Sequence, residues 1–169
     1  MICGGSHEQG LLTDVHVFNL STRTWFAQPI KSHGFSSRYE HAAVPVNRYD
    51  EAGQVVGTDI LVFGGCGEEG LLNDTWILDT TKWSFRELIT KGSKPSARTN
   101  RTLAVVNVAP RKAVEQDNVP SGGLIGGATT LRSNSNQRVY VFGGGDVGDQ
   151  AVLDQSVYCL DPCELSCLF

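Results

Sequence analysis

The sequence lacks any excess of basic residues. Its 14 lysines and arginines are outnumbered by 18 aspartates and glutamates, which gives a net charge of −4 at pH 7. Nucleic acids and anionic membrane surfaces attract proteins through concentrated positive charge. The charge balance therefore argues against a nucleic-acid partner and against a membrane partner.

Long hydrophobic runs are also missing. A helix that spans a bilayer needs roughly 20 apolar residues in a row, and the apolar runs of this chain are far shorter. The N-terminus has no basic region followed by the apolar core of a secretory signal. We expect no transmembrane segment and a cytosolic or nuclear protein, with the cytoplasm preferred.

Cysteines are few and odd in number, which does not suit the paired framework of a disulfide-stapled domain. The five are Cys3, Cys66, Cys159, Cys163 and Cys167. Cys159 falls inside an expected strand, and Cys163 and Cys167 have no histidine partner to complete the four ligands of a structural zinc site. We predict reduced thiols, no metal and no cofactor.

Apolar residues at helical spacing are absent as well. The chain has 19 glycines and a single methionine, a composition that suits a turn-rich β protein. We predict an all-β fold with little or no helix.

The most informative stretch that is present covers residues 59–88 and reads DILVFGGCGEEGLLNDTWILDTTKWSFREL. Residues 60–63 form an apolar run that suits a strand covered on both faces, and the run stops at Gly64 and Gly65. Residues 75–78 and 83–88 read as two further strands around a turn. The stretch predicts a small antiparallel meander.

This unit recurs. Residues 2–26 repeat the glycine pair as Gly4 and Gly5, followed by the same pattern of leucines, an aspartate and Trp25, sixty positions before Gly64 and Phe85. Residues 138–161 repeat the apolar run and the pair as Gly143 and Gly144, with a loop three residues longer. Three copies with matched spacing indicate a repeat architecture.

The pattern resembles the kelch repeat, in which each copy is one blade of a β-propeller. The resemblance includes the opening segment of each blade, where Arg38 and His41 fit the family's Arg-x-x-His pattern and residues 95–98 fit the same place one repeat later. The chain departs from the family at Arg101, where a histidine is usual, and the third copy lacks the tryptophan.

The resemblance implies a partial kelch-type propeller of four-stranded antiparallel blades, with two to three blades present. We expect an incomplete first blade at 1–28, a second at 38–88, a third at 98–161 with a disordered insertion at 109–137, and a divergent tail at 162–169. Propellers need about four to eight blades to close. The chain is therefore expected to be a fragment of a larger propeller, although closure by joining other chains and a truncated product are alternatives.

The residues that define the repeat are expected to be structural. The glycine pairs mark points where another backbone or a large side chain approaches closely, and Trp25 and Phe85 on outer strands would fill the space between blades. Trp76 occupies an aromatic packing position shared with His16 and Tyr158, and His41 is most simply a structural histidine of the opening segment.

The family's usual role is a rigid platform for protein recognition, so we expect a scaffold or adaptor that binds a protein or peptide through its blade loops. Two groups of loops are expected to converge on one face. The acidic group holds His7, Glu8, Glu68, Glu69, Asp146 and Asp149, and the basic group holds Lys31, His33, Lys91 and Lys94.

Arg38 and Arg98 lie at the rim of the same expected surface. A guanidinium can hold a carboxylate with two hydrogen bonds, so these two are the best sequence candidates for gripping an acidic or phosphorylated peptide. In the alternative, each arginine binds loop carbonyls of its own blade.

Catalysis finds no support in these residues. A kelch-like propeller carries the copper site of galactose-oxidase-type enzymes, but the four histidines and the tyrosines show no spacing that would bring copper ligands together. No nucleophile with a partnered base and no phosphate-binding loop is present. We predict a non-enzyme; the alternative is a fragment of a propeller enzyme whose catalytic residues lie outside this chain.

Overall fold

The computed structural model describes residues 1–50, 52–107, 137–145 and 156–160. These residues form strands and loops and no helix, which confirms the predicted all-β fold. None of the described segments is a helix of the length and hydrophobicity needed to cross a membrane. The tail at 162–169 and nearly all of the expected insertion at 109–137 lie outside the described residues. The last residue of that range, Gln137, is instead the buried first residue of a strand.

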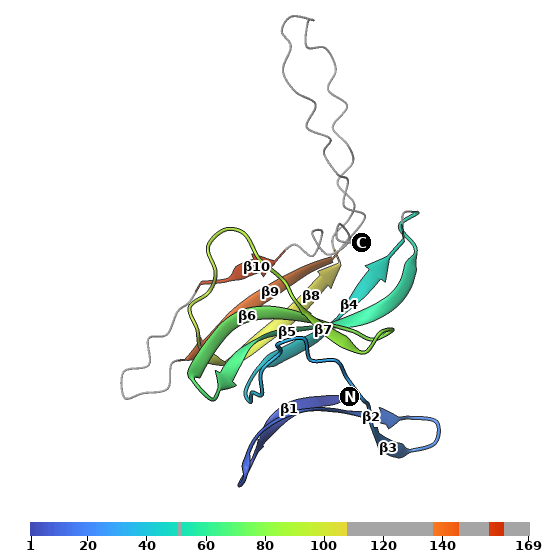
Figure 1. Ribbon diagram of the computed structural model, residues 1–169. Coiled ribbons are helices and arrows are strands. Elements are labelled where there is room, and N and C mark those ends of the chain that lie inside the picture. Colours follow the sequence, from blue (N-terminus) through green and yellow to red (C-terminus); the bar gives the residue numbers. More distant parts are fainter. Residues whose placement is uncertain (51, 108–136, 146–155, 161–169) are drawn as a thin grey trace, which may run out of the picture.

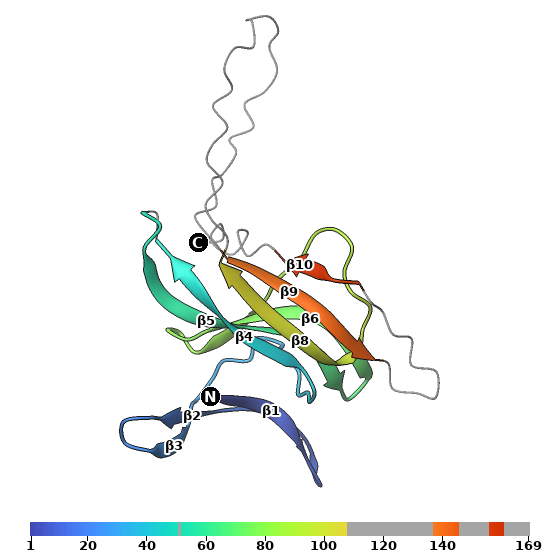
Figure 2. The ribbon, with the colours of Figure 1, turned by 180° about the vertical axis from the view of Figure 1, so that it is seen from behind.

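The described strands form three antiparallel sheets. The first contains β1 (Ile2–His7), β2 (Gly10–Asn19) and β3 (Thr24–Ala27), the second contains β4 (Ala42–Tyr49), β5 (Val55–Gly67), β6 (Gly70–Asp79) and β7 (Ser84–Glu87), and the third contains β8 (Thr99–Asn107), β9 (Gln137–Gly145) and β10 (Tyr158–Leu160). In each sheet the strands lie side by side in chain order. Figures 1 and 2 show the second sheet between the other two.

The repeat seen in the sequence is also a repeat in strand register. Val62 pairs with Trp76 and Cys66 with Leu71 in the second sheet, and the residues sixty positions earlier pair in the same way in the first. Both pairs of strands shift register at the first glycine of the pair. The first two copies therefore share their strand register residue by residue, so equivalent positions differ by sixty in number.

The second sheet extends further than expected at one end. The sequence predicts a polar excursion at 47–58 between two strands of this sheet, but β4 continues to Tyr49 and β5 begins at Val55. The polar residues there are paired across the sheet: Arg48 lies 3.3 Å from the Asp59 carboxylate and 3.4 Å from the Asp79 carboxylate. Cross-strand ion pairs can support a hairpin that lacks an apolar pattern, which is why the hydrophobic run alone predicted strands that were too short.

Apolar side chains pack in the two spaces between the sheets. Val15 of the first sheet packs with Val62, Trp76 and Phe85 of the second in one cluster. A second cluster joins the second and third sheets around Leu61, Phe63, Ile77, Val139 and Val141. Each fully buried large side chain contributes roughly 1.5–3 kcal/mol to folding, so the contact between blades is a major source of stability.

The two aromatic residues expected between blades differ in position. Phe85 is 1% exposed and lies in the first cluster, as expected for such a residue. Trp25 is 53% exposed and lies against Phe18, with ring centroids 5.0 Å apart. Within the described residues, Phe85 fills a contact between blades and Trp25 lies on an open face of the first sheet.

The glycine pair allows close approach of neighbouring backbone. Gly65 has a φ of +99°, and a Cβ there would lie 2.7 Å from the Tyr39 carbonyl oxygen and 2.9 Å from the His41 amide. Gly5, at the matching position of the first sheet, has a φ of +120° and nothing within 4 Å of such a Cβ. Both positions favour glycine through the backbone angle, but only Gly65 also requires it because of space.

This difference predicts unequal costs of alanine at the two positions. Gly65→Ala should lower the free energy of unfolding by about 2–5 kcal/mol, because strain from the positive φ adds to overpacking against backbone that cannot move aside. Gly5→Ala should cost only the strain, about 1–2 kcal/mol. Urea unfolding followed by tryptophan fluorescence would measure both, and equal losses would contradict the assigned close approach.

Candidate partner-binding surface

The first sequence candidate, Arg38, is completely buried. Its two terminal nitrogens donate to the two carboxylate oxygens of Asp74, at 2.7 and 2.8 Å. It also donates to the Gly64 carbonyl and to the carbonyl and hydroxyl of Ser36. The ring of Phe35 lies 4.4 Å from the guanidinium. The side chain thus joins the opening segment, the glycine pair and β6 of one blade, as in the alternative in which Arg38 binds its own blade.

Asp74 is held as a carboxylate by these contacts. Burial alone would raise its pKa, but hydrogen bonds from Arg38 and from the Trp76 indole outweigh burial and lower the pKa below its ordinary value. The indole nitrogen donates to the Asp74 carboxylate at 2.6 Å. Arginine and aspartate therefore remain a charged, hydrogen-bonded pair at neutral pH.

Arg98 is also buried, with 6% of its surface exposed. Its guanidinium donates to the carbonyl and the hydroxyl of Ser96, as that of Arg38 does to Ser36. The two arginines predicted at the rim of a binding surface are thus directed into their own blades.

The arginine and aspartate pair predicts a large effect on stability. Replacing Arg38 by Met should lower the free energy of unfolding by about 3–5 kcal/mol, because Asp74 then keeps a partly buried charge without its partner. Arg23→Met, on the exposed turn between β2 and β3, serves as the control and should change stability by less than about 0.5 kcal/mol. Urea unfolding would measure both, and similar values would contradict a structural role for Arg38.

His41 lies close to the same arginine. Burial lowers the pKa of its imidazole, and the positive charge of Arg38 lowers it further. Its Nδ1 atom is buried and has no hydrogen-bond partner among the described residues. The folded blade therefore favours the neutral imidazole, in agreement with the structural role expected for this residue.

A pH dependence follows from the lowered pKa. The unfolded chain takes up a proton at His41 near the ordinary pKa of about 6.5, whereas the folded chain does so only at lower pH. The contribution of His41 to the free energy of unfolding should therefore be fully present above about pH 6.5 and should be lost on acidification, by at most about 1.4 kcal/mol per pH unit. His41→Gln should flatten the profile between pH 6.5 and 5, and His33→Gln should not; an unchanged profile in the His41 variant would refute the assignment.

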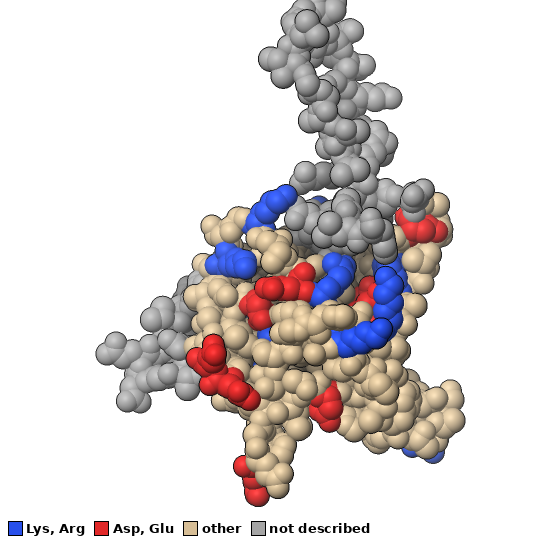
Figure 3. All heavy atoms as spheres, in the orientation of Figure 1, with Lys and Arg blue, Asp and Glu red and all other residues tan. Residues whose placement is uncertain are grey.

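The acidic loop residues lie on the tips of two hairpins. His7 and Glu8 are exposed at the turn between β1 and β2, and Glu68 and Glu69 are exposed at the turn between β5 and β6. In Figure 3 separate groups of acidic side chains lie at the lower left and at the bottom of the view, and others lie near its centre. The remaining two, Asp146 and Asp149, lie outside the described residues.

The basic loop residues do not all lie beside the acidic hairpins. The Lys31 amide donates to the Trp83 carbonyl, and Lys31 bridges to Ser84 at the start of β7. That end of β7 is separated from the Glu68 hairpin by the length of β6, about 30 Å for ten residues. His33 is exposed in the same connection as Lys31, and Lys91 and Lys94 are exposed in the next one.

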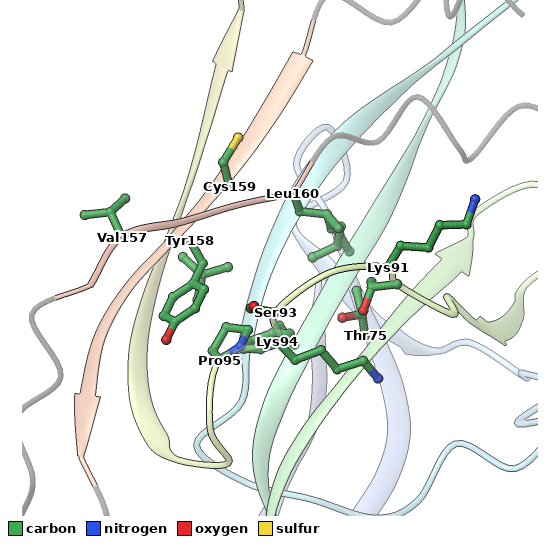
Figure 4. A pocket seen from close by; sticks show the side chains of 13 residues that line it. Thr75, Lys91, Ser93, Lys94, Pro95, Val157, Tyr158, Cys159 and Leu160 are labelled. Carbon is green, nitrogen blue, oxygen red and sulfur yellow. The ribbon is translucent and has the colours of Figure 1, made fainter. Parts of the chain in front are cut away.

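The connection that carries Lys91 and Lys94 borders a pocket of about 220 Å³ between the second and third sheets. Its buried lining residues Leu61, Phe63 and Val141 give it an apolar floor, and Val157 and Leu160 line it as well. Hydroxyl groups of threonines and a serine line it as well, and none of the described lining residues carries a carboxylate. Figure 4 shows both lysine side chains extending from the connection, on the side away from Tyr158. The pocket therefore combines an apolar floor with a basic rim.

A sequence difference between repeats explains the pocket. Phe35 stacks on Phe85 at 3.9 Å and meets Trp76 edge-on at 5.5 Å, so it fills the corresponding space between the first two blades. Sixty positions later the residue is Pro95, which is buried but smaller and lines the pocket beside Tyr158. The exchange of phenylalanine for proline removes the ring that closes this space one repeat earlier.

No metal centre is formed by the residues that the structure describes: none of their His, Cys, Asp and Glu side chains gather in groups of three or more that could hold an ion. Burial raises the pKa of the Cys3 thiol to about 11, which keeps it protonated at neutral pH. Cys163 and Cys167 lie outside the described residues.

Sequence reasoning missed the partners of Arg38 and the pocket. Asp74 could have been found, because an aspartate recurs sixty positions apart as Asp14 and Asp74. Ser36 and Ser96 share the same spacing, two residues before each arginine. The pocket had no signal of its own beyond the exchange of Phe35 for Pro95.

Three antiparallel sheets packed face to face, each with a glycine pair and the first two with a register shift at that pair, define a segment of a β-propeller. The KLHDC2/KLHL20/DRC7 Kelch-repeats domain matches residues 1–109, and the chain belongs to the kelch-repeat family.

Several curated proteins are similar to the chain. The Rab9 effector protein with kelch motifs from Bos taurus is 29% identical over 95% of the chain and 33% of its own length. The Adagio-like protein 3 from Oryza sativa subsp. japonica is 36% identical over 62% of the chain and 16% of its own length. The Kelch domain-containing protein 2 from Bos taurus is 25% identical over 94% of the chain and 30% of its own length. The chain thus spans about a third or less of the length of these relatives.

Proposed function

We propose that this chain is a non-enzymatic scaffold or adaptor that binds a protein or peptide partner at the pocket between its second and third blades. The observation that carries the proposal is the pocket itself, with its apolar floor and the rim formed by Lys91 and Lys94. The name of the Rab9 effector relatives, which describes a role exercised on another protein, supports protein binding as the general activity.

The size of the pocket favours a peptide or protein over a small molecule. Small-molecule sites commonly measure about 300–1,000 Å³, whereas this pocket of about 220 Å³ suits one or two side chains of a larger partner. An apolar side chain would occupy the floor, and a neighbouring carboxylate or phosphate would meet the lysines. The acidic or phosphorylated peptide expected from the sequence is therefore retained, with these lysines in place of Arg38 and Arg98.

We further propose that the three sheets, taken as blades at 1–28, 38–88 and 98–161, belong to a larger propeller. The relatives are about three times as long as the chain or longer. Ile2 in β1 is 57% exposed, whereas its counterpart Val62 in β5 is 1% exposed. This difference is what an outer blade would show before another blade or segment covers it.

The binding proposal predicts a defined peptide preference. Random peptides displayed on phage and selected on the immobilised full chain should be enriched in sequences that join an acidic residue to an apolar one. Binding of a selected peptide should weaken at least tenfold in the double variant Lys91→Gln, Lys94→Gln, because charge-assisted contacts contribute about 1.5–3 kcal/mol. Isothermal titration calorimetry would measure the affinities.

Lys82→Gln provides a matched control. Lys82 is also an exposed lysine, but it lies on the turn between β6 and β7 and does not line the pocket. Its replacement should leave peptide affinity unchanged. Selected peptides without acidic residues, or equal binding by the wild type and the double variant, would refute the pocket as the binding site.

A further inference from the structure

The gap between the second and third sheets is polar at positions where the gap between the first and second sheets is apolar. In the first of these gaps, Val15 and Ile30 pack in the apolar cluster. Sixty positions later the residues are Thr75 and Thr90, and both line the pocket. The shared strand register makes Val15 and Thr75 equivalent. Each exchange therefore puts a hydroxyl group where the preceding repeat has only carbon.

Thr75 is the most buried of the hydroxyl-bearing residues in the pocket lining, with 4% of its surface exposed. Its backbone carbonyl accepts a hydrogen bond from the Leu88 amide at 2.7 Å. Its hydroxyl forms no hydrogen bond with the described residues. Because a buried hydroxyl without a partner costs free energy, a ligand atom that accepts a hydrogen bond from Thr75 would remove this cost.

The connection beside the pocket also carries one more lysine than the connection one repeat earlier. Lys31 and Lys91 occupy equivalent positions, but Lys94 replaces Gly34. In the view of Figure 4, Thr75 lies between the side chains of Lys91 and Lys94. The pocket therefore joins two ammonium groups to a set of hydroxyls.

This set of donors suits a phosphate group better than a carboxylate. A phosphate monoester carries a charge of about −1.5 to −2 at pH 7 and has three strong acceptor oxygens, whereas a carboxylate carries one charge on two oxygens. The pocket offers two positive charges and three aliphatic hydroxyls, from Lys91, Lys94, Thr75, Thr90 and Ser93. The match is therefore closer in charge and in the number of oxygens that can be satisfied.

We propose that the pocket recognises a phosphorylated serine or threonine in a segment of a partner protein. This inference rests on the function proposed above and narrows the partner from acidic peptides to phosphorylated ones. The phosphate lies at the lysine rim and accepts a hydrogen bond from the Thr75 hydroxyl, and an apolar side chain next to the phosphorylated residue enters the floor beside Leu61 and Phe63. Binding at this pocket is then switched on by a kinase that acts on the partner.

A protein segment suits the pocket better than other carriers of phosphate. Nucleic acids and anionic membranes present many phosphates and are held by extended positive charge, whereas this chain has a net charge of −4 and the pocket lining holds two lysines. Free inorganic phosphate would leave the apolar floor unfilled. A phosphorylated residue with an apolar neighbour satisfies both halves of the pocket.

The test uses the full chain and three bead-bound peptide libraries with the same randomised flanking positions. The libraries differ only in a central phosphoserine, glutamate or serine. The labelled chain should be retained most strongly by the phosphoserine library, on peptides with an apolar residue beside the phosphoserine. In calorimetric titrations the best phosphopeptide should bind at least about tenfold more tightly than the same peptide with glutamate, because the phosphate has the larger charge and one more acceptor oxygen.

The double variant Thr75→Val, Thr90→Val removes the hydroxyls and keeps both lysines and the shape of the side chains. It should reduce the preference for phosphoserine over glutamate to about threefold or less, because each lost hydrogen bond is worth a modest amount of free energy. Thr75→Val alone should lose part of the preference. Thr58→Val is the control, because Thr58 is exposed on β5 and does not line the pocket; it should leave the preference unchanged.

The outcomes separate this inference from the function on which it rests. Equal or tighter binding of the glutamate peptide would overturn the phosphate assignment and leave a pocket for acidic peptides. Retention by none of the libraries would overturn both proposals. Equal effects of Thr58→Val and of the double variant would place the phosphate elsewhere on the chain. Binding to vesicles that contain a phosphorylated phosphatidylinositol, without binding to phosphopeptides, would assign the pocket to a lipid headgroup and overturn the peptide assignment.

Discussion

The second blade depends on one buried guanidinium. The side chain of Arg38 bonds Asp74, Ser36 and the Gly64 carbonyl, while its own carbonyl accepts a hydrogen bond from the Gly5 amide of the preceding blade at 2.9 Å. A buried charge is costly unless it is paired and its hydrogen bonds are satisfied. Because the partners of the guanidinium come from the opening segment, β5 and β6, the charge is tolerated only when all three are in place. The arginine therefore couples the internal order of one blade to its contact with the next.

The repeat tolerates substitutions at positions around this centre, and the substitutions create its individual features. Arg101 replaces the histidine of the opening segment, and its guanidinium lies over the Phe63 ring at 4.3 Å. Burial and the nearby Arg98 lower its pKa to about 10, so it still carries a positive charge at neutral pH. His41 in the preceding repeat favours its neutral form. Positions 41 and 101 are thus equivalent in adjacent blades but differ in charge at neutral pH.

Much of the fold could be predicted because it follows from local sequence patterns. The apolar runs, the glycine pairs and the sixty-residue period located the strands and their order without any long-range information. The lengths of β4 and β5 could not be predicted in this way. They depend on ion pairs between Arg48 and the carboxylates of Asp59 and Asp79, which become neighbours only when the sheet forms. The repeated arginines likewise marked Arg38 as a candidate residue, but they did not show whether its side chain points into the blade or out of it. The orientation of the side chain depends on the position of Asp74, a carboxylate 36 residues away.

The proposed pocket would select its partner by charge as well as by shape. It has lysines at its rim and no described carboxylate in its lining, so an acidic segment is attracted and a basic one is repelled. A side chain of the partner must also enter a space of about 220 Å³ between two sheets. Because one ligand has to satisfy both requirements, neither an acidic segment without a suitable apolar side chain nor an apolar segment without an acidic group fits the whole site.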